Sequence, residues 1–149
     1  MSIHIHIVDG SLADTAPAWP GFDEGSAGAL LRFDGIVRRL ENDRPIVALD
    51  YEAYEPMASR QIRQLAEELT GEFGLLGVFV EHSRGRIPVG KRAFRLRVAS
   101  GHRKEALQAV DRFIDRLKQN VPIWKSPVYA ASEPDHVVGS QGAQAEKGR

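Results

Sequence analysis

The chain has 149 residues, of which 42% are hydrophobic, which suffices for one domain with its own core. Its 20 basic and 20 acidic residues cancel, so no overall field attracts nucleic acid or a membrane surface. The lack of cysteine excludes disulfides, thiolate catalysis and cysteine-ligated zinc. No apolar run approaches about 18 residues and no basic-then-apolar signal opens the chain, so we expect a soluble cytoplasmic protein.

The N-terminal third of the chain predicts three strands. Residues 2–8 alternate isoleucine with histidine and predict a half-buried strand, and the Pro, Gly, Asp and Ser of residues 9–28 predict a loop. Residues 28–38 and 46–54 predict two further strands. The turn-forming residues at 40–45 suggest that these two strands pair as a hairpin.

Two helices and three more strands follow. A helix is predicted from Pro56, with apolar residues at helical spacing, and Gly71 or Gly74 ends it. Residues 75–83 and 91–100 predict strands, and the glycines and proline of residues 84–90 predict a loop between them.

The last elements are a helix and a short strand. The helix is predicted over about residues 101–119, with Pro122 ending it, and a strand over residues 123–129. This order of elements predicts an α+β fold with a mostly antiparallel sheet and two main helices. We expect a single domain over residues 1–130 and a flexible tail over residues 131–149, which has no aromatic residue and little periodicity.

The second predicted helix begins with a candidate anion site. If Ser100 caps it, His102 and Arg103 fall in its first turn. Cations are disfavoured there by the helix dipole, whereas free backbone N–H groups favour anions. The pair is therefore explained by a bound phosphate or carboxylate, or by side chains that simply point to solvent.

Two lysines surround the end of this helix. Lys118 lies at the edge of the apolar stripe, and Lys125 follows Trp124 in a segment that Pro122 keeps extended. A partly desolvated lysine close to other cations can act as a nucleophile or proton carrier. The alternative is that Lys118 complements the helix dipole and Lys125 is merely solvated.

Other polar residues have plainer interpretations. Arg38 ends a strand after Gly35, which marks a bulge or a close backbone approach, and it either has a binding role or protects a sheet edge. His4 and His6 share a strand face but have no third metal ligand nearby, so we interpret them as solvated and expect no metal. The basic run, made up of Arg84, Arg86, Lys91, Arg92, Arg95 and Arg97, suggests an acidic protein partner or solvation rather than nucleic acid.

Four segments, in order, resemble the large, catalytic subunit of molybdopterin synthase. They are "GALLRFDGIVR", "LDYEAYEPMA", "HSRGRIPVGKRAFRLRVASGHRKEAL" and "IDRLKQNVPIWK", and they span about residues 27–125. The motifs Ser-x-His-Arg and Asp-x-Leu-Lys-x-x-x-Pro-x-Trp-Lys within them are specific to that family.

The resemblance implies an α/β-hammerhead fold and a homodimer at the centre of a heterotetramer. A small ubiquitin-like subunit would insert its Gly-Gly C-terminus, which carries a thiocarboxylate, into each large subunit. Its sulfur would go to cyclic pyranopterin monophosphate to make the dithiolene of molybdopterin. No metal or organic cofactor is implied for this step.

The resemblance also implies roles for individual residues. Lys118 and Lys125 match the catalytic lysines, with either one polarising the thiocarboxylate and the other transferring a proton or stabilising charge. The substrate-binding residues that it implies are Ile36, Val37, Arg38, His102 and Arg103. Together these residues predict one cleft in which both lysines and the His-Arg pair converge.

The chain departs from the family pattern in three places, one of which is the region 9–26, which has little family character. Ser126 and Pro127 stand where the family commonly has another charged residue and a glutamate, and residues 130–145 lack the basic residue that its C-terminal segment often supplies. The last two departures motivate the alternative of a non-catalytic paralogue that only binds a ubiquitin-like Gly-Gly tail.

Overall fold

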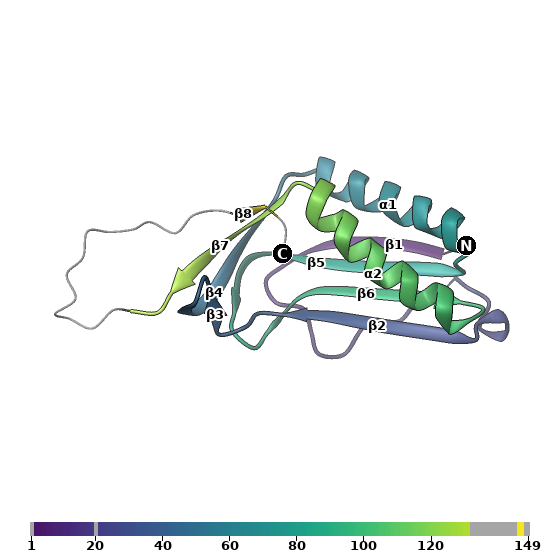
Figure 1. The fold of residues 1–149 in the computed structure, drawn as a ribbon, viewed down its shortest axis with the longest axis horizontal. Helices are drawn as coiled ribbons and strands as arrows, with labels where there is room; N and C mark the ends of the chain where they lie inside the picture. Colours follow the sequence, from purple (N-terminus) through teal and green to yellow (C-terminus); the bar gives the residue numbers. More distant parts are fainter. Residues whose placement is uncertain (1, 20, 132–145, 148–149) are drawn as a thin grey trace.

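A twisted sheet with two helices packed on one face forms the framework of the molecule (Figure 1). The computed structural model describes residues 2–19, 21–131 and 146–147. The elements in chain order are β1 (Ser2–Asp9), the 3-10 turn η1 (Glu24–Ser26), β2 (Ala29–Ile36), β3 (Leu40–Glu41), β4 (Arg44–Ala53), α1 (Met57–Phe73), β5 (Gly77–Pro88), β6 (Arg92–Ser100), α2 (Arg103–Asn120), β7 (Ile123–Tyr129) and β8 (Glu146–Lys147).

The sheet has two parts that share the long strand β5. In the first part the order is β2-β6-β5-β1, in which only β1 and β5 are parallel. Past its middle, β5 pairs with β4, which continues the sheet through β7 to β8 and also pairs with β3. The predicted α+β class, the mostly antiparallel sheet and the two main helices are confirmed.

The hairpin predicted between the second and third strands is wrong. β2 pairs with β6, whereas β4 pairs with β5 and β7. The turn residues instead form a tighter hairpin, in which Asn42 and Asp43 have φ of 54° and 58° and join β3 to β4. Asparagine and aspartate tolerate this left-handed conformation, which two-residue hairpin turns require.

Two boundaries differ from the sequence prediction. The segment 84–90 was expected as a loop, but β5 continues to Pro88 because its last residues pair with β4. His102, not Ser100, is the N-cap of α2, and the Ser100 hydroxyl donates a hydrogen bond to the His102 carbonyl. Of the two glycines predicted to end α1, Gly71 lies inside the helix and Gly74, whose φ of 63° suits a helix C-cap, ends it.

The core lies between the helices and the sheet. α1 and α2 bury one stripe each, and the strands β5 and β6 bury the residues that face them. Phe113, Ile62 and Leu96 are among the largest fully buried side chains. Each such side chain contributes about 1.5–3 kcal/mol on burial, which fixes α2 firmly above the sheet.

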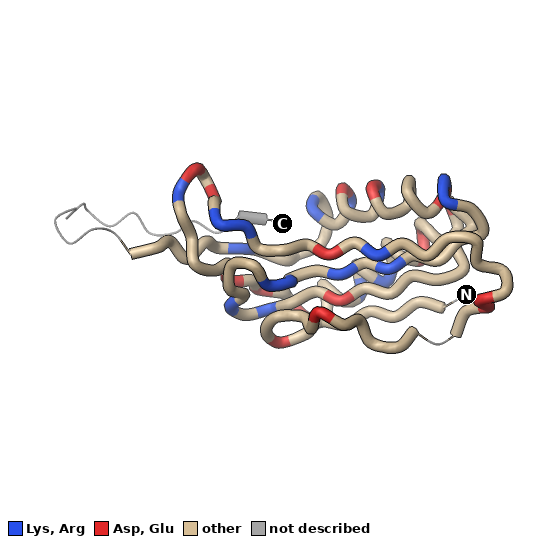
Figure 2. Tube along the Cα trace, turned by 90° about the horizontal axis from the view of Figure 1, so that it is seen from below, with Lys and Arg blue, Asp and Glu red and all other residues tan. Residues whose placement is uncertain are grey.

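The opposite face of the sheet carries a network of ion pairs. Figure 2 shows this face, with basic and acidic residues interspersed along the strands. Arg95 is fully buried and its guanidinium lies 3.1 Å from both Asp34 and Glu81. The basic run was interpreted as solvated or bound to an acidic partner, and for Arg95 this is wrong because the chain supplies the carboxylates itself.

The C-terminal segment is only partly within the described residues. Most of the predicted flexible tail, residues 132–145 and 148–149, lies outside them. Glu146 and Lys147 are described, and they form β8 opposite Lys125 and Trp124 of β7. Within the described ranges, neither helix is long and apolar enough to cross a membrane.

Candidate active site

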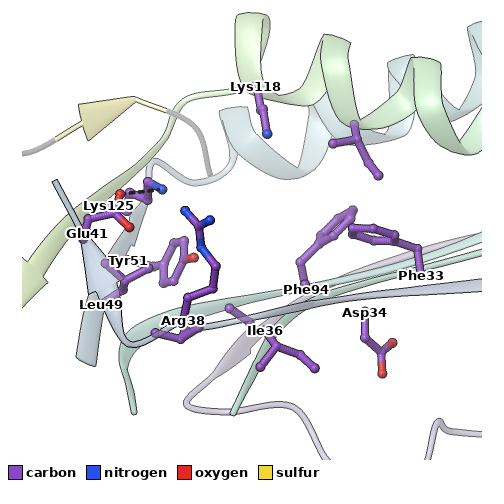
Figure 3. Close-up of a pocket in the computed structure, with 14 residues that line it drawn as sticks. Phe33, Asp34, Ile36, Arg38, Glu41, Leu49, Tyr51, Phe94, Lys118 and Lys125 are labelled. Carbon is purple, nitrogen blue, oxygen red and sulfur yellow. Dashed lines mark ion pairs between the residues drawn. The ribbon is translucent and has the colours of Figure 1, made fainter. Parts of the chain in front are cut away.

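A cleft of about 390 Å³ opens where the two parts of the sheet meet the end of α2 (Figure 3). Its walls come from six elements, namely β2 with the residues after it, β3, β4, β6, β7 and the last turns of α2. The lining residues are Phe33, Asp34, Gly35, Ile36, Val37, Arg38, Glu41, Leu49, Tyr51, Ala93, Phe94, Ile114, Lys118 and Lys125.

Arg38 is held in the cleft by its backbone neighbours. The Val37 N–H donates to the Lys91 carbonyl at 3.0 Å, and the Val37 carbonyl accepts from Gly90 at 2.8 Å. The register of β2 shifts between Gly35 and Ile36, which is the irregularity that Gly35 predicts. The chain therefore leaves the sheet at a fixed point, and the Arg38 guanidinium rises into the cleft (Figure 3).

The two lysines enter the same cleft from different elements. Lys118 comes from the last turn of α2, and Lys125 comes from β7, where it pairs with Tyr51 of β4. Figure 3 shows the Lys118 amine pointing down toward the space that the Arg38 guanidinium also faces. Lys118 is exposed in the described chain, so the chain alone does not desolvate its side chain.

His102 and Arg103 do not line this cleft. They lie at the start of α2, fully 15 residues before Lys118, which at 1.5 Å per residue is about 22 Å along the helix. Both are exposed. The expectation that all the predicted site residues converge within one chain is therefore wrong, because Ile36, Val37, Arg38 and the lysines meet and the His-Arg pair does not.

The floor of the cleft is apolar and aromatic. The rings of Phe33 and Phe94 lie 6.1 Å apart, and Ile114 of α2 faces them. Tyr51 packs edge-on against His82, with ring centroids 5.3 Å apart. A flat heterocycle can rest on such a surface while its charged groups reach the cations.

The electrostatics of the cleft favour an anion. Arg38, Lys118 and Lys125 bring three positive charges, and Glu41 brings one negative charge within 3.2 Å of the Lys125 amine. Asp34 also borders the cleft, but its carboxylate turns away to the arginines beneath the sheet (Figure 3). Burial would raise the pKa of Asp34, but hydrogen bonds from these arginines lower it to about 2.

A metal centre has no support from the described residues. No group of three His, Asp or Glu side chains lies close enough together there to hold an ion. His4 shares a hydrogen bond of 2.9 Å with the Ser2 hydroxyl, and the rings of His4 and His6 both pack near Phe79. His4 is therefore half-buried on the sheet surface, whereas His6 is exposed, as its interpretation as a solvated residue expects.

Sequence reasoning missed Glu41, Tyr51 and the two phenylalanines of the floor. Glu41 falls in a segment that reads as a turn, and only the pairing of β3 with β4 brings it to Lys125. The alternation of β2 and β6 could have indicated that Phe33 and Phe94 share the helix-facing side with Lys118.

The fold and cleft together define a protein with a site suited to an anionic, ring-containing molecule, lined by a guanidinium and two amines. A guanidinium and two amines above an apolar floor are suited to positioning such a molecule and to moving charge or protons on it.

The comparisons with known proteins give the particular family. The family model described as "MoaE protein" matches residues 12–120, and the chain belongs to this family. It is 37% identical over 111 residues to the molybdopterin synthase catalytic subunit of Bacillus subtilis, covering 74% of this chain and 71% of that protein. The human molybdopterin synthase catalytic subunit is 35% identical, covering 70% of this chain and 56% of that protein.

Solved structures agree with this assignment. Molybdopterin synthase from Staphylococcus aureus superposes with a TM-score of 0.71 at 28% identity, covering 84% of each chain. A complex of subunits 1 and 2 of molybdopterin-converting factor from Helicobacter pylori superposes with a TM-score of 0.65 at 25% identity, covering 85% of this chain and 89% of that one.

Proposed function

We propose that this chain is the catalytic subunit of a molybdopterin synthase. It takes sulfur from the thiocarboxylated C-terminus of a small ubiquitin-like subunit and transfers it to cyclic pyranopterin monophosphate. The observation that carries the proposal is the convergence of Arg38, Lys118 and Lys125 on one cleft with an apolar floor. The proposed setting is the cytoplasm.

The position of each residue in the cleft indicates its role in the reaction. Arg38 binds the phosphate of the pterin through charge-assisted hydrogen bonds, and Phe33 and Phe94 support its ring. Lys118, at the open side of the cleft, meets the incoming thiocarboxylate. Lys125, deeper in the wall, donates or accepts a proton or stabilises developing negative charge.

The small subunit provides the sulfur, and its C-terminal segment also excludes water from Lys118. A C-terminal Gly-Gly segment has no side chains, so it can enter a cleft of about 390 Å³ that also holds a substrate. Its entry would cover the exposed Lys118 and exclude water, which strengthens every electrostatic interaction in the site. The Helicobacter pylori complex of two subunits supports such an assembly.

A second copy of the chain is proposed to complete the site. β2 is an edge strand of the described sheet, and Leu30 and Ile36 on it are 61% and 48% exposed. α2 runs along β2. Its start lies near Ala29, which pairs with Ser100 just before α2 begins, and its end lies near Ile36, which lines the cleft together with Lys118.

Antiparallel pairing of two β2 edges would therefore place the start of one α2 beside the end of the other. His102 and Arg103 of each copy would then reach the cleft of its partner. This arrangement restores the predicted anion cluster and explains why two cations occupy an exposed helix start.

Reconstitution with the thiocarboxylated small subunit and the pterin precursor tests the proposal. We expect Lys118→Ala and Lys125→Ala each to lower turnover about 100-fold or more, because both groups act on the reacting atoms. Lys91→Ala is the matched control, since Lys91 is exposed and does not line the cleft.

The same assay separates the enzyme from a paralogue that only binds the Gly-Gly tail. Tail binding without turnover by the unmodified chain would favour the paralogue. Ser126 and Pro127, which motivate that alternative, pair with Asp50 and Leu49 and do not line the cleft, so the departure lies outside the proposed machinery.

A further inference from the structure

Glu41 is a carboxylate in a cleft proposed to bind anions. Its charge opposes the binding of a phosphate or thiocarboxylate, so its place beside Arg38 and Lys118 calls for a role other than substrate binding. Figure 3 shows that the dashed ion pair joins it to Lys125 and that both side chains lie at the wall of the cleft.

The geometry of this pair differs from that of the surface pairs. The distance from Lys125 Nζ to Glu41 Oε1 is 3.2 Å, and the two side chains are only 13% and 12% exposed. Surface pairs such as that of Arg86 and Asp50 are far more exposed, so they hold their side chains in one orientation only weakly. An ion pair shielded from water is screened little, so it fixes the orientation of both partners.

The chain builds this contact through the β3–β4 hairpin. The two-residue turn at Asn42 and Asp43 directs Glu41 toward β7. The hairpin is also attached to β7 at Tyr129, whose hydroxyl accepts a hydrogen bond of 3.1 Å from the Asn42 side chain. The Arg44 guanidinium stacks 3.8 Å from the centre of the same ring.

β7 itself offers no acid next to Lys125 on the same face. Residue 127, two positions along the strand and therefore on that face, is a buried proline. The direct cross-strand neighbours of Lys125 are Tyr51 on β4 and Glu146 on β8. The carboxylate whose side chain is placed on the Lys125 amine is that of Glu41.

We infer that Glu41 is a positioning residue that holds the Lys125 amine in place and aims it into the cleft. The inference rests on the proposed function and deepens it. Of the two roles that the sequence left open for the lysines, it gives the charge-stabilising and proton-donating role to Lys125.

Kinetics of Glu41→Gln test the inference, with Asp50→Asn as control. Asp50 is also on the second part of the sheet and ion-paired, but it lies outside the cleft. We expect Glu41→Gln to lower kcat about tenfold, with an unchanged or lower KM for the pterin substrate. In the Lys125→Ala background, the same change should cause no further loss of kcat.

A lower KM with an unchanged kcat would overturn the inference, because Glu41 would then only weaken substrate binding. A full additional loss in the Lys125→Ala background would overturn it as well.

Amine labelling gives a readout that does not depend on turnover. With acetic anhydride at neutral pH, we expect Lys125 to react about tenfold faster in Glu41→Gln than in the unmodified chain, relative to Lys91, because the Glu41 carboxylate no longer occupies its amine. Equal rates would contradict the pairing. If the unmodified chain had no turnover, the proposed function would fail, while the labelling would still decide the role of Glu41. Circular dichroism of each variant verifies that the fold is intact.

Discussion

Two clusters of cations lie on opposite faces of the same sheet and differ in how their charge is neutralised. Beneath the sheet, Arg32, Arg92 and Arg95 surround Asp34, and Glu81 adds a second carboxylate. On the helix side, Arg38, Lys118 and Lys125 line a cleft in which the Glu41 carboxylate pairs with the Lys125 amine.

This difference in neutralisation indicates that the cluster beneath the sheet, the lower cluster, stabilises the fold, whereas the cluster in the cleft is suited to binding a ligand. In the lower cluster, donors and acceptors are matched at distances of 2.7–3.1 Å, and the ion pairs bind the loop after β1 to the sheet through Asp14. In the cleft, positive charge exceeds negative charge and the space above it is open. A cleft whose lining carries more basic than acidic side chains suits an anionic ligand, and this criterion identifies the cleft without reference to relatives.

The largest expected effect concerns the shared site. The double variant His102→Ala/Arg103→Ala and the variant Lys118→Ala should each be nearly inactive alone. Mixed in equal amounts after reversible unfolding, they should recover about a quarter of wild-type turnover, because half the dimers then contain one intact site of two. Activity assays on the mixture check this.

No recovery in a mixture shown to contain mixed dimers would contradict the contribution of the His-Arg pair from a partner. Mixing Lys118→Ala with Lys125→Ala is the matched control. Both lysines lie in the same cleft, so every site in that mixture lacks one of them and no activity should return.

Arg38 should affect substrate affinity more than the chemical step. We expect Arg38→Ala to raise the KM for the phosphorylated pterin about 10- to 100-fold, the value of one or two charge-assisted hydrogen bonds. Arg38→Lys should recover only part of this, because an ammonium cannot bind phosphate in a bidentate manner.

Arg39→Ala is the control for Arg38, since its exposed side chain points outside the cleft lining while its carbonyl still accepts from Ile46. An equal increase in KM for both variants would mean that the effect is one of general charge rather than of a built phosphate site.

The local elements of this chain could be predicted from sequence, whereas the contacts between them could not. Residues 123–129 were predicted as a strand and form β7, because their alternation and Pro122 are local signals. The pairing of β2 with β6 rather than β4 depends on residues about 65 positions apart, which no local pattern contains.

The same limit applies to the site. Lys118, Lys125 and Arg38 belong to motifs that are recognisable along the chain, and the structure brings all three to one cleft. Glu41 becomes visible only through the β3–β4 turn, and the burial of Arg95 only through the loop that covers the lower face. The sequence predicts which residues bear chemistry, and the tertiary fold decides which of them meet.

The lower cluster should contribute to stability and not to turnover. We expect Asp34→Asn to lower the free energy of unfolding by about 2 kcal/mol at pH 7. This is the free energy that corresponds to lowering the pKa of Asp34 from 3.8 to about 2 on folding. Because the folded pKa lies below the unfolded one, this stability is present above about pH 4 and is lost as pH falls toward 2.

The difference in free energy of unfolding between the wild type and Asp34→Asn should therefore decrease to about 1 kcal/mol at pH 3, as measured by urea denaturation. Asp9→Asn, which removes an exposed ion pair with Arg84, is the matched control and should change stability little. A gap that stays constant with pH would contradict the charge-based account of the lower cluster.

The smallest expected effect links the hairpin turn to the cleft. Asp43 has φ of 58°, so Asp43→Val should cost about 1–2 kcal/mol of stability, whereas Asp43→Gly should stay within about 0.5 kcal/mol of the wild type. Urea denaturation measures both. Because the turn directs Glu41 to Lys125, Asp43→Val should also lower kcat, and Asp43→Gly should not. If valine were tolerated with full stability and turnover, the turn would not be what holds Glu41 in the cleft.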